Sequence, residues 1–228
     1  MERLSAQPQL VDRVYAAILD AICEGRLAPG ARLTQDSLAE GLAVSRQPVL
    51  QALLLLKNQG FVRDAGRRGL MVAPLDPRHV AHLYQVRGAL DATAAASAAS
   101  RTPDARTASR GRALIAAGRA AVDSDDVGQM IAADIDFHRF IYELSGNPLI
   151  ADTAALHWRH LRRVMGGVLR TRRVAEHVWD EHAAILEAIV ARDAPRAERL
   201  ARAHAERAAR ELAGELAALD ESKRRISA

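Results

Sequence analysis

The sequence predicts a mainly α-helical protein, with an N-terminal winged helix-turn-helix followed by a C-terminal antiparallel six-helix bundle. Apolar residues make up 49% of the 228 residues and aromatic residues only 4%, which is typical of helices that pack through small side chains. Apolar positions recur at helical spacing in both halves of the chain. Two short strand-like segments fall together between residues 61 and 72, which favours a small wing rather than a large sheet.

The first three expected elements are helices. Apolar residues recur at helical spacing from Val11 to Ile22, and Gly25 is placed to end this first helix. Thr34 is the expected N-cap of a short second helix. Ser45 is the expected N-cap of a third helix, which runs to about Gln59.

Strand-like segments at Phe61–Arg63 and Leu70–Val72 flank a glycine-rich turn and predict a hairpin. Three helices and a hairpin make a winged helix-turn-helix, which we assign to residues 8–75. Its third helix would enter the major groove of double-stranded operator DNA with its N-terminus first. A local cluster of cations supports a nucleic-acid partner: Arg46, Lys57, Arg63, Arg67 and Arg68.

Pro74, Asp76 and Pro77 mark a linker, and residues 77–220 are predicted to form a second, all-helical domain. Turn and breaker residues divide it into six helices, expected near 78–100, 104–122, 125–145, 147–169, 173–192 and 195–219. Six antiparallel helices with short connections form a bundle, and bundle cores are common sites for metals and ligands.

Four candidate metal ligands stand out in this helical half. Asp134 and His138 are four residues apart, so one helix presents both on the same face. His182 and His204 fall on two later helices. Three imidazoles and a carboxylate suit a divalent transition metal such as zinc, nickel or manganese, with room for a further ligand.

Other features of the sequence restrict the class of protein. No apolar run approaches the length of about 20 residues that a membrane span needs, and the N-terminus has no signal-peptide pattern. Cys23 is the single cysteine, so an internal disulfide is excluded. A cytoplasmic protein without membrane partners is expected.

The stretch from Gly25 to Pro74, with "LAEGLAVSRQPV" at its centre, resembles the DNA-binding domain of the GntR family of bacterial regulators. The resemblance implies DNA contact, and the candidate residues are Thr34, Ser45, Arg46, Gln47, Arg67, Arg68 and Gly69. The chain departs from the family at Asp36 and Leu50, where members commonly carry arginine. Fewer cations predict weaker non-specific affinity and a flatter dependence on salt.

Three later segments resemble the FCD effector domain of the FadR branch of these regulators: Val86–Asp91, Asp134–Ile150 and Glu181–Glu206. The count of six helices resembles the vanillate-regulator-like group. The resemblance implies that Asp134, His138, His182 and His204 bind the metal and that a small organic acid binds against it. Together these observations predict a ligand-responsive, homodimeric transcriptional repressor that is not an enzyme.

Arg87 and Asn147 are the candidate residues for contact with the effector. An arginine can hold a carboxylate through two hydrogen bonds, although a salt bridge from Arg87 to Asp91 four residues later is an equal alternative. Asn147 follows Gly146 at a helix start, where it can instead cap the helix.

Other interpretations remain open from sequence. Leu50, Leu54 and Leu55 exceed what the core stripe of the third helix needs: they can pack on a neighbouring domain or subunit, meet thymine methyl groups, or mark DNA binding that has decayed. The alternative functions are a metal-dependent hydrolase-like helical protein, since a metal can activate water, and a protein-interaction scaffold.

Overall fold

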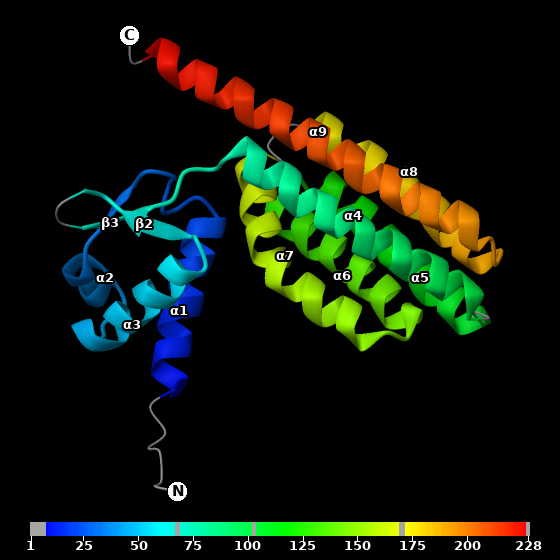
Figure 1. Ribbon diagram of the computed structural model, residues 1–228, viewed down its shortest axis with the longest axis horizontal. Coiled ribbons are helices and arrows are strands. Elements are labelled where there is room, and N and C mark those ends of the chain that lie inside the picture. Colours follow the sequence, from blue (N-terminus) through cyan, green and yellow to red (C-terminus); the bar gives the residue numbers. More distant parts are fainter. Residues whose placement is uncertain (1–7, 67–68, 102–103, 169–171, 227–228) are drawn as a thin grey trace, which may run out of the picture. The chain divides into compact units, whose positions relative to one another are not determined.

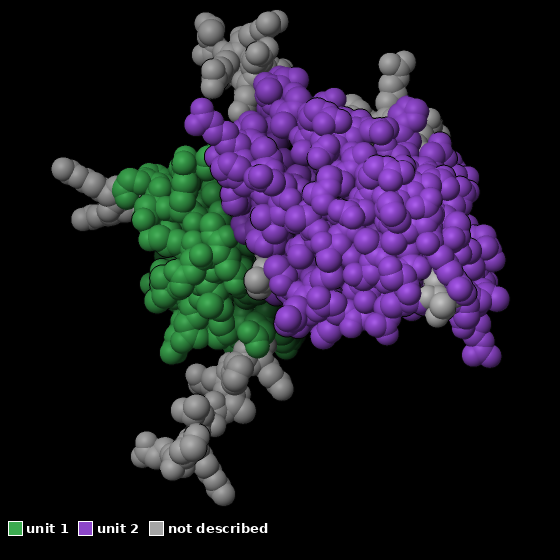
Figure 2. Space-filling model, turned by 45° about the vertical axis from the view of Figure 1, so that its right-hand side comes forward, with its two compact units in different colours: residues 1–75 green, residues 76–228 purple. Residues whose placement is uncertain are grey.

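The computed structural model describes residues 8–66, 69–101, 104–168 and 172–226. It divides into two compact units, residues 1–75 and 76–228 (Figure 2). The elements of the first unit are α1 (Pro8–Cys23), β1 (Arg32–Leu33), α2 (Gln35–Gly41), α3 (Arg46–Asn58), β2 (Val62–Asp64) and β3 (Leu70–Val72). Those of the second are α4 (Pro77–Ser100), α5 (Ala105–Asp123), α6 (Val127–Ser145), α7 (Pro148–Val168), α8 (Arg172–Val190) and α9 (Ala194–Ile226) (Figure 1).

The first unit is a winged helix-turn-helix, as predicted. Its strands form an antiparallel sheet in the order β1-β3-β2. The two predicted strands are present, the first shifted by one residue, but β1 was not predicted. Leu33 of β1 pairs with Leu70 of β3, and a two-residue strand is too short to show any period in the sequence.

The predicted ends of the short helices follow local rules, with one exception. The Thr34 hydroxyl accepts a hydrogen bond from the Ser37 amide at 3.2 Å and so caps α2. Gly25, just after α1, has a φ of +75°, which glycine adopts without a steric penalty. Ser45 has the extended backbone of an N-cap residue, but its side chain makes no capping hydrogen bond. The prediction that Ser45 caps α3 is therefore right for its position and wrong for its side chain.

The core of the first unit lies between α1, α3 and the sheet. Val49, Leu53 and Leu56 of α3 are completely buried there, and they pack with residues such as Ile18 and Phe61. Because Val49, Leu53 and Leu56 fill the core, the other leucines of α3 lie on the surface of the unit. Leu50, Leu54 and Leu55 are all exposed.

The second unit contains the six expected helices, most of whose bounds lie within a few residues of the predicted ones; α9 extends further at its C-terminus. α4 packs against α9 and α6, while α5 packs against α6 and α8, and α8 against α9. α4 and α9 lie side by side and run antiparallel (Figure 1). Gly146 has a left-handed backbone at the end of α6, which allows the chain to turn directly into α7.

Glycine allows α5 to approach α8 closely. A Cβ atom at Gly118 would lie 2.0 Å from ring carbons of Trp179, and one at Gly111 would lie 2.6 Å from a methyl carbon of Leu186. Gly118 leaves room for the buried Trp179 indole beside α5, and Gly111 leaves room for Leu186. Within the described part of the chain, no helix combines the length and apolar character needed to cross a membrane.

Candidate metal centre

Three helices of the bundle bring the four predicted ligand residues together. α6 supplies Asp134 and His138 from successive turns, α8 supplies His182, and α9 supplies His204. All four side chains are buried, and their candidate ligand atoms all lie within 4.8 Å of one another. Residues separated by up to 70 positions in the sequence therefore form one cluster.

The spacing of the donor atoms fits a single divalent ion. His182 Nε2 lies 3.3 Å from His204 Nε2 and 3.5 Å from Asp134 Oδ1, and His138 Nε2 lies 3.7 Å from the same oxygen. Atoms that bind one ion at about 2.0–2.2 Å lie about 3.0–3.6 Å apart when they are adjacent ligands. The observed distances are close to this range, as expected for donor atoms that can share one ion.

Asp91 of α4 orients one of the ligand histidines. Its Oδ2 lies 3.4 Å from His138 Nδ1, and its Oδ1 accepts a hydrogen bond from the Tyr142 hydroxyl at 2.5 Å. A carboxylate on one ring nitrogen fixes the ring and directs the other nitrogen, Nε2, toward the cluster. Burial alone would raise the pKa of Asp91, but His138 and the Arg87 guanidinium outweigh it and lower that pKa.

Glu181 of α8 orients His204 in the same way. Its Oε2 lies 2.7 Å from His204 Nδ1, while its other oxygen forms an ion pair with Arg207. Sequence reasoning did not identify Glu181 as part of the site. The sequence places Glu181 directly before His182, but in the fold Glu181 contacts His204 on α9 instead.

His182 is held by aromatic rings. It is completely buried, and its ring stacks on the Phe137 ring at a centroid distance of 4.2 Å. The Trp179 ring packs against it in a T-shaped arrangement at a centroid distance of 4.8 Å. Its Nδ1 has no hydrogen-bond partner among the described residues. Packing rather than a carboxylate therefore fixes this ring.

Burial keeps two of the histidines neutral. It lowers the pKa of His138, and the nearby Arg87 guanidinium lowers it further. The pKa of His182 falls well below its usual value because of burial and the neighbouring His204 and His138. Because a histidine must be deprotonated to bind a metal, both shifts favour the form that a metal centre requires.

Arg87 of α4 lies against the candidate ligands. Its Nη2 is 2.5 Å from His138 Nε2 and 3.5 Å from Asp134 Oδ2, and its Nε donates to Asp91 Oδ2 at 3.2 Å. The guanidinium also lies over the Trp158 ring at 4.7 Å. Burial opposes its charge, but the surrounding carboxylates raise the pKa of Arg87. The predicted salt bridge to Asp91 is thus present, and the same side chain also faces a cavity.

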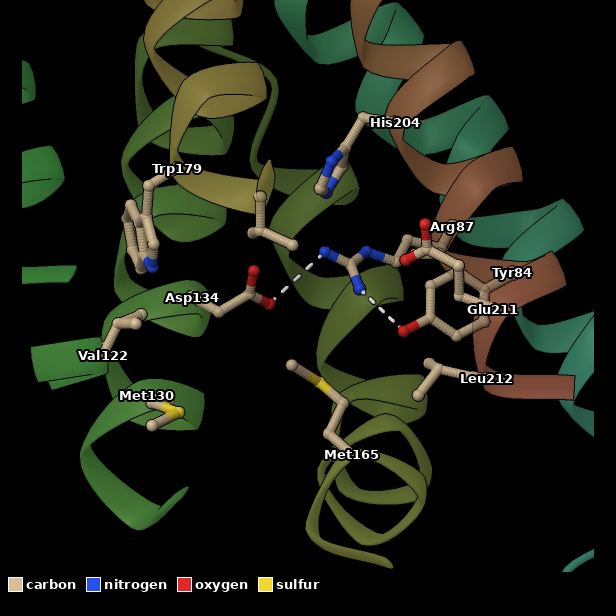
Figure 3. A pocket seen from close by; sticks show the side chains of 12 residues that line it. Tyr84, Arg87, Val122, Met130, Asp134, Met165, Trp179, His204, Glu211 and Leu212 are labelled. Carbon is tan, nitrogen blue, oxygen red and sulfur yellow. Dashed lines mark hydrogen bonds and ion pairs between the residues drawn. The ribbon is translucent and has the colours of Figure 1, made fainter. Parts of the chain in front are cut away.

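This cavity adjoins the cluster (Figure 3); it is small, with a volume of about 50 Å³, and it is partly open to solvent. Figure 3 shows Arg87 directed into it, between Asp134 and the Tyr84 hydroxyl. Most of the wall is apolar, and the lining residues are Tyr84, Arg87, Val122, Met130, Asp134, Met165, Val178, Trp179, His204, Ala208, Glu211 and Leu212. An apolar pocket with a few converging polar groups is typical of a small-molecule site.

Asn147, the second candidate for effector contact, lies elsewhere. It is exposed at the start of α7, and its Oδ1 accepts a hydrogen bond from the Leu149 amide at 3.1 Å. It does not line the cavity. The structure thus brings Arg87, but not Asn147, to the candidate metal centre, and Asn147 acts as a helix cap.

The candidate DNA-contacting residues lie on the first unit. Thr34, Ser45, Arg46, Gln47 and Gly69 are all exposed, whereas Arg67 and Arg68 lie outside the described residues. Two cations of the predicted basic cluster are paired with carboxylates. Arg46 Nε lies 2.5 Å from Asp36 Oδ1, and Lys57 lies 2.7 Å from Asp64. These ion pairs reduce the local positive charge.

Comparison with known proteins agrees with both units. Residues 10–72 match the family described as bacterial regulatory proteins, gntR family, and residues 82–207, more than half of the chain, match the FCD domain. The chain is 27% identical over 191 residues to an HTH-type transcriptional regulator in an unstable DNA locus of Streptomyces ambofaciens, covering 84% of this chain and 80% of that protein. It is 27% identical over 220 residues to the HTH-type transcriptional repressor NanR of Klebsiella aerogenes, covering 87% and 84%.

Solved structures share the fold. E. coli McbR/YncC aligns with a TM-score of 0.73 at 21% identity, over 92% of this chain and 98% of that one. A GntR-type regulator from Rhodococcus sp. RHA1 aligns with a TM-score of 0.75 at 24% identity, over 90% and 97%. The fold agrees with these solved structures, and the buried Asp/His cluster is consistent with the FCD match. The chain therefore belongs to the gntR family of DNA-binding transcriptional regulators, not to a family of enzymes, and to the FadR-like branch whose C-terminal domain is FCD.

Proposed function

We propose that the protein is a homodimeric, ligand-responsive repressor whose FCD domain binds a divalent transition metal and a small organic acid. In this proposal residues 8–75 form the DNA-binding domain, and residues 77–220 form the ligand-binding and dimerisation domain. The observation that carries it is the convergence of four buried donor residues into one cluster, two of which, Asp134 and His204, line a cavity together with Arg87. A regulator of DNA-directed transcription would act in the cytoplasm.

Asp134, His138, His182 and His204 are the proposed metal ligands, with zinc, nickel or manganese as candidate ions. When bound, the metal supplies a Lewis-acidic cation with a position for an oxygen atom of the effector. Asp91 and Glu181 hold His138 and His204 in place. This support is expected to matter because hydrogen bonds behind ligand histidines tune metal affinity.

Arg87 is the proposed second anchor of the acid. Its charge persists in the buried site because Asp134 and Asp91 surround it, and a guanidinium can hold a carboxylate through parallel hydrogen bonds. The apolar wall formed by Met130, Met165 and Leu212 would contact the carbon skeleton of the acid. Such a site favours an anion with an apolar part over an uncharged ligand.

Helix α4 offers a direct route from the effector to the DNA-binding domain. It starts at Pro77, two residues after the first unit ends at Leu75, and it carries Arg87. An effector that binds one arrangement of α4 more tightly shifts the dimer toward that arrangement. The half-sites of a dimeric operator tolerate little error in the spacing of the recognition helices, about 34 Å per helical turn. Effector binding is thereby expected to weaken operator binding.

The metal is tested first. The full chain, purified without chelator, is analysed by mass spectrometry beside an Asp134→Ala/His182→Ala double variant and an Asp136→Ala control, whose side chain is exposed on the same helix. We expect a single divalent ion per chain in the wild type and the control, and none in a folded double variant. A folded wild type that takes up no zinc, nickel or manganese contradicts the proposed site.

The effector class is tested on metal-loaded protein. Small carboxylates and the matching uncharged amides are compared by thermal shift, and those that bind are then added to operator-binding measurements. Carboxylates are expected to raise the melting temperature and lower operator affinity, whereas amides are not. A carboxylate that binds but leaves operator affinity unchanged refutes the switch, and light scattering tests the dimer independently.

A further inference from the structure

The outer face of α3 carries more apolar surface than a recognition helix needs for folding. Leu50 is 40% exposed and Leu54 is 50% exposed, although Val49, Leu53 and Leu56 of the same helix are completely buried. Because the buried three already fill the core, folding does not account for the exposed pair. Their place on the recognition helix of a gntR-type module suggests a role in DNA binding.

The exposed leucines differ in their position around the helix. With a turn of about 100° per residue, Leu50 and Leu54 lie about 40° and 80° from Arg46. Leu55 lies about 180° away on the opposite flank, although it is 41% exposed. Leu50 and Leu54 therefore share a face with Arg46, while Leu55 does not.

Arg46 is held by a residue of the preceding helix. Its Nε lies 2.5 Å from Oδ1 of Asp36 on α2, and both side chains are largely exposed. This ion pair engages Nε, the inner nitrogen of the guanidinium. An arginine oriented in this way can present its two terminal nitrogens to the O6 and N7 acceptors of guanine.

We propose that this face reads a guanine through Arg46, with Asp36 as its positioning residue, and thymine methyl groups through Leu50 and Leu54. Apolar side chains distinguish thymine by contact with its C5-methyl group in the major groove. The half-site is thus expected to contain a guanine and nearby thymines.

DNA fits this face better than a protein partner does. The leucines are not a continuous apolar patch, because Arg46, Gln47 and Gln51 are exposed on the same side of the helix. Glutamine and arginine are the usual readers of adenine and guanine, and the core of a protein interface is instead depleted of charge. The leucines extend the DNA-binding surface from its N-terminal end along α3.

Uracil substitution tests the thymine contacts, because uracil lacks only the methyl group. The full chain first selects duplexes from a random-sequence pool, and each thymine of the enriched half-site is then replaced by uracil in turn. Loss of a methyl contact is expected to weaken wild-type binding about threefold to fivefold, the equivalent of about 0.8 kcal/mol of apolar burial. In Leu50→Ala or Leu54→Ala the corresponding uracil should cause no further loss.

Leu55→Ala is the matched control, since it removes an equally exposed leucine from the other flank. It is expected to keep the full sensitivity to uracil, and circular dichroism checks that every variant is folded. Uracil penalties that are absent from the wild type, or that persist in both leucine variants, overturn the thymine contacts. So does failure to enrich any sequence, or a changed oligomeric state in Leu50→Ala, which would assign this face to a second copy of the chain.

Asp36→Asn tests the positioning role. We expect replacement of the contacted guanine by 7-deazaguanine, which lacks the N7 acceptor, to cost the variant less than the wild type. Binding to non-selected duplex should strengthen and become more salt-dependent, because a released Arg46 can reach phosphate. If Asp36 merely repels DNA, affinity for every duplex rises equally and the 7-deazaguanine penalty stays unchanged, which would overturn the positioning role.

Discussion

The contact between Glu181 and His204 predicts how strongly a residue outside the ligand set controls metal affinity. Glu181 Oε2 lies 2.7 Å from His204 Nδ1, in a place where the His204 side chain is only 3% exposed. The carboxylate fixes the tautomer in which His204 Nε2 carries the lone pair for a metal. Replacing Glu181 with glutamine keeps an oxygen acceptor but removes the charge.

The size of the effect follows from the kind of hydrogen bond that is lost. A hydrogen bond to a charged partner is worth about 1.5–3 kcal/mol, against about 0.5–1.5 kcal/mol for a neutral one. Glu181→Gln is thus expected to cost about 1–1.5 kcal/mol, which is about fivefold to tenfold in the dissociation constant of the metal. Glu181→Ala leaves His204 Nδ1 without its partner and should cost about 10-fold to 100-fold.

The assay is competition with a chromogenic chelator on the purified full chain. Glu187→Gln is the matched control, because Glu187 lies on the same helix with an exposed side chain. We expect wild type and control to agree, Glu181→Gln to bind the metal more weakly, and Glu181→Ala more weakly still. Equal affinity in all four proteins would refute the claim that Glu181 supports a metal ligand.

Three further changes test the packing and the metal centre. Gly118→Ala should lower the free energy of unfolding by about 1–3 kcal/mol, because its Cβ would lie 2.0 Å from the Trp179 ring. Chemical denaturation measures this loss. The control is Gly214→Ala, whose Cβ meets nothing within 4 Å and which should stabilise the protein slightly. Leu53→Ala should lower the free energy of unfolding by about 2–5 kcal/mol in the same assay. Leu54→Ala, at an exposed position, should change it by less than about 0.5 kcal/mol. Equal losses in the two variants would contradict the assignment of Leu53 to the core. Chelation of metal present at about 100 times its dissociation constant should remove about 2.7 kcal/mol, seen as a lower melting temperature in calorimetry. The Asp134→Ala/His182→Ala variant should not respond, and an equal response would place the metal elsewhere.

Much of the fold was predictable because its signals are local. The periodic apolar residues, Gly146 with Pro148, and the turn before α9 were enough to divide the second unit into six helices. The same local rules located Thr34 as the cap of α2. They failed for β1, which exists only because Leu33 pairs with Leu70, a partner 37 positions away.

The candidate metal centre was predictable in its membership but not in its supports. The spacing of Asp134 and His138 follows from helical geometry, His182 and His204 were candidates by residue type on two later helices, and the family resemblance implied that all four bind one metal. Nothing in the sequence indicated that Glu181, next to His182, would contact His204 instead. The sequence left two roles open for Asn147, contact with the effector or capping of a helix, and in the structure its Oδ1 accepts a hydrogen bond from the Leu149 amide at the start of α7.

The helical architecture and the DNA-binding module follow from the sequence alone, because period, capping and motif act over a few neighbouring residues. The four candidate metal ligands follow from residue type and family resemblance. Which side chains meet across helices depends instead on tertiary packing. The rotation of each helix about its axis and the approach between helices depend on packing, as at Gly118 and Trp179. The ion pair between Asp36 and Arg46, and the position of Arg87 between Asp134 and Asp91, arise from those packing choices.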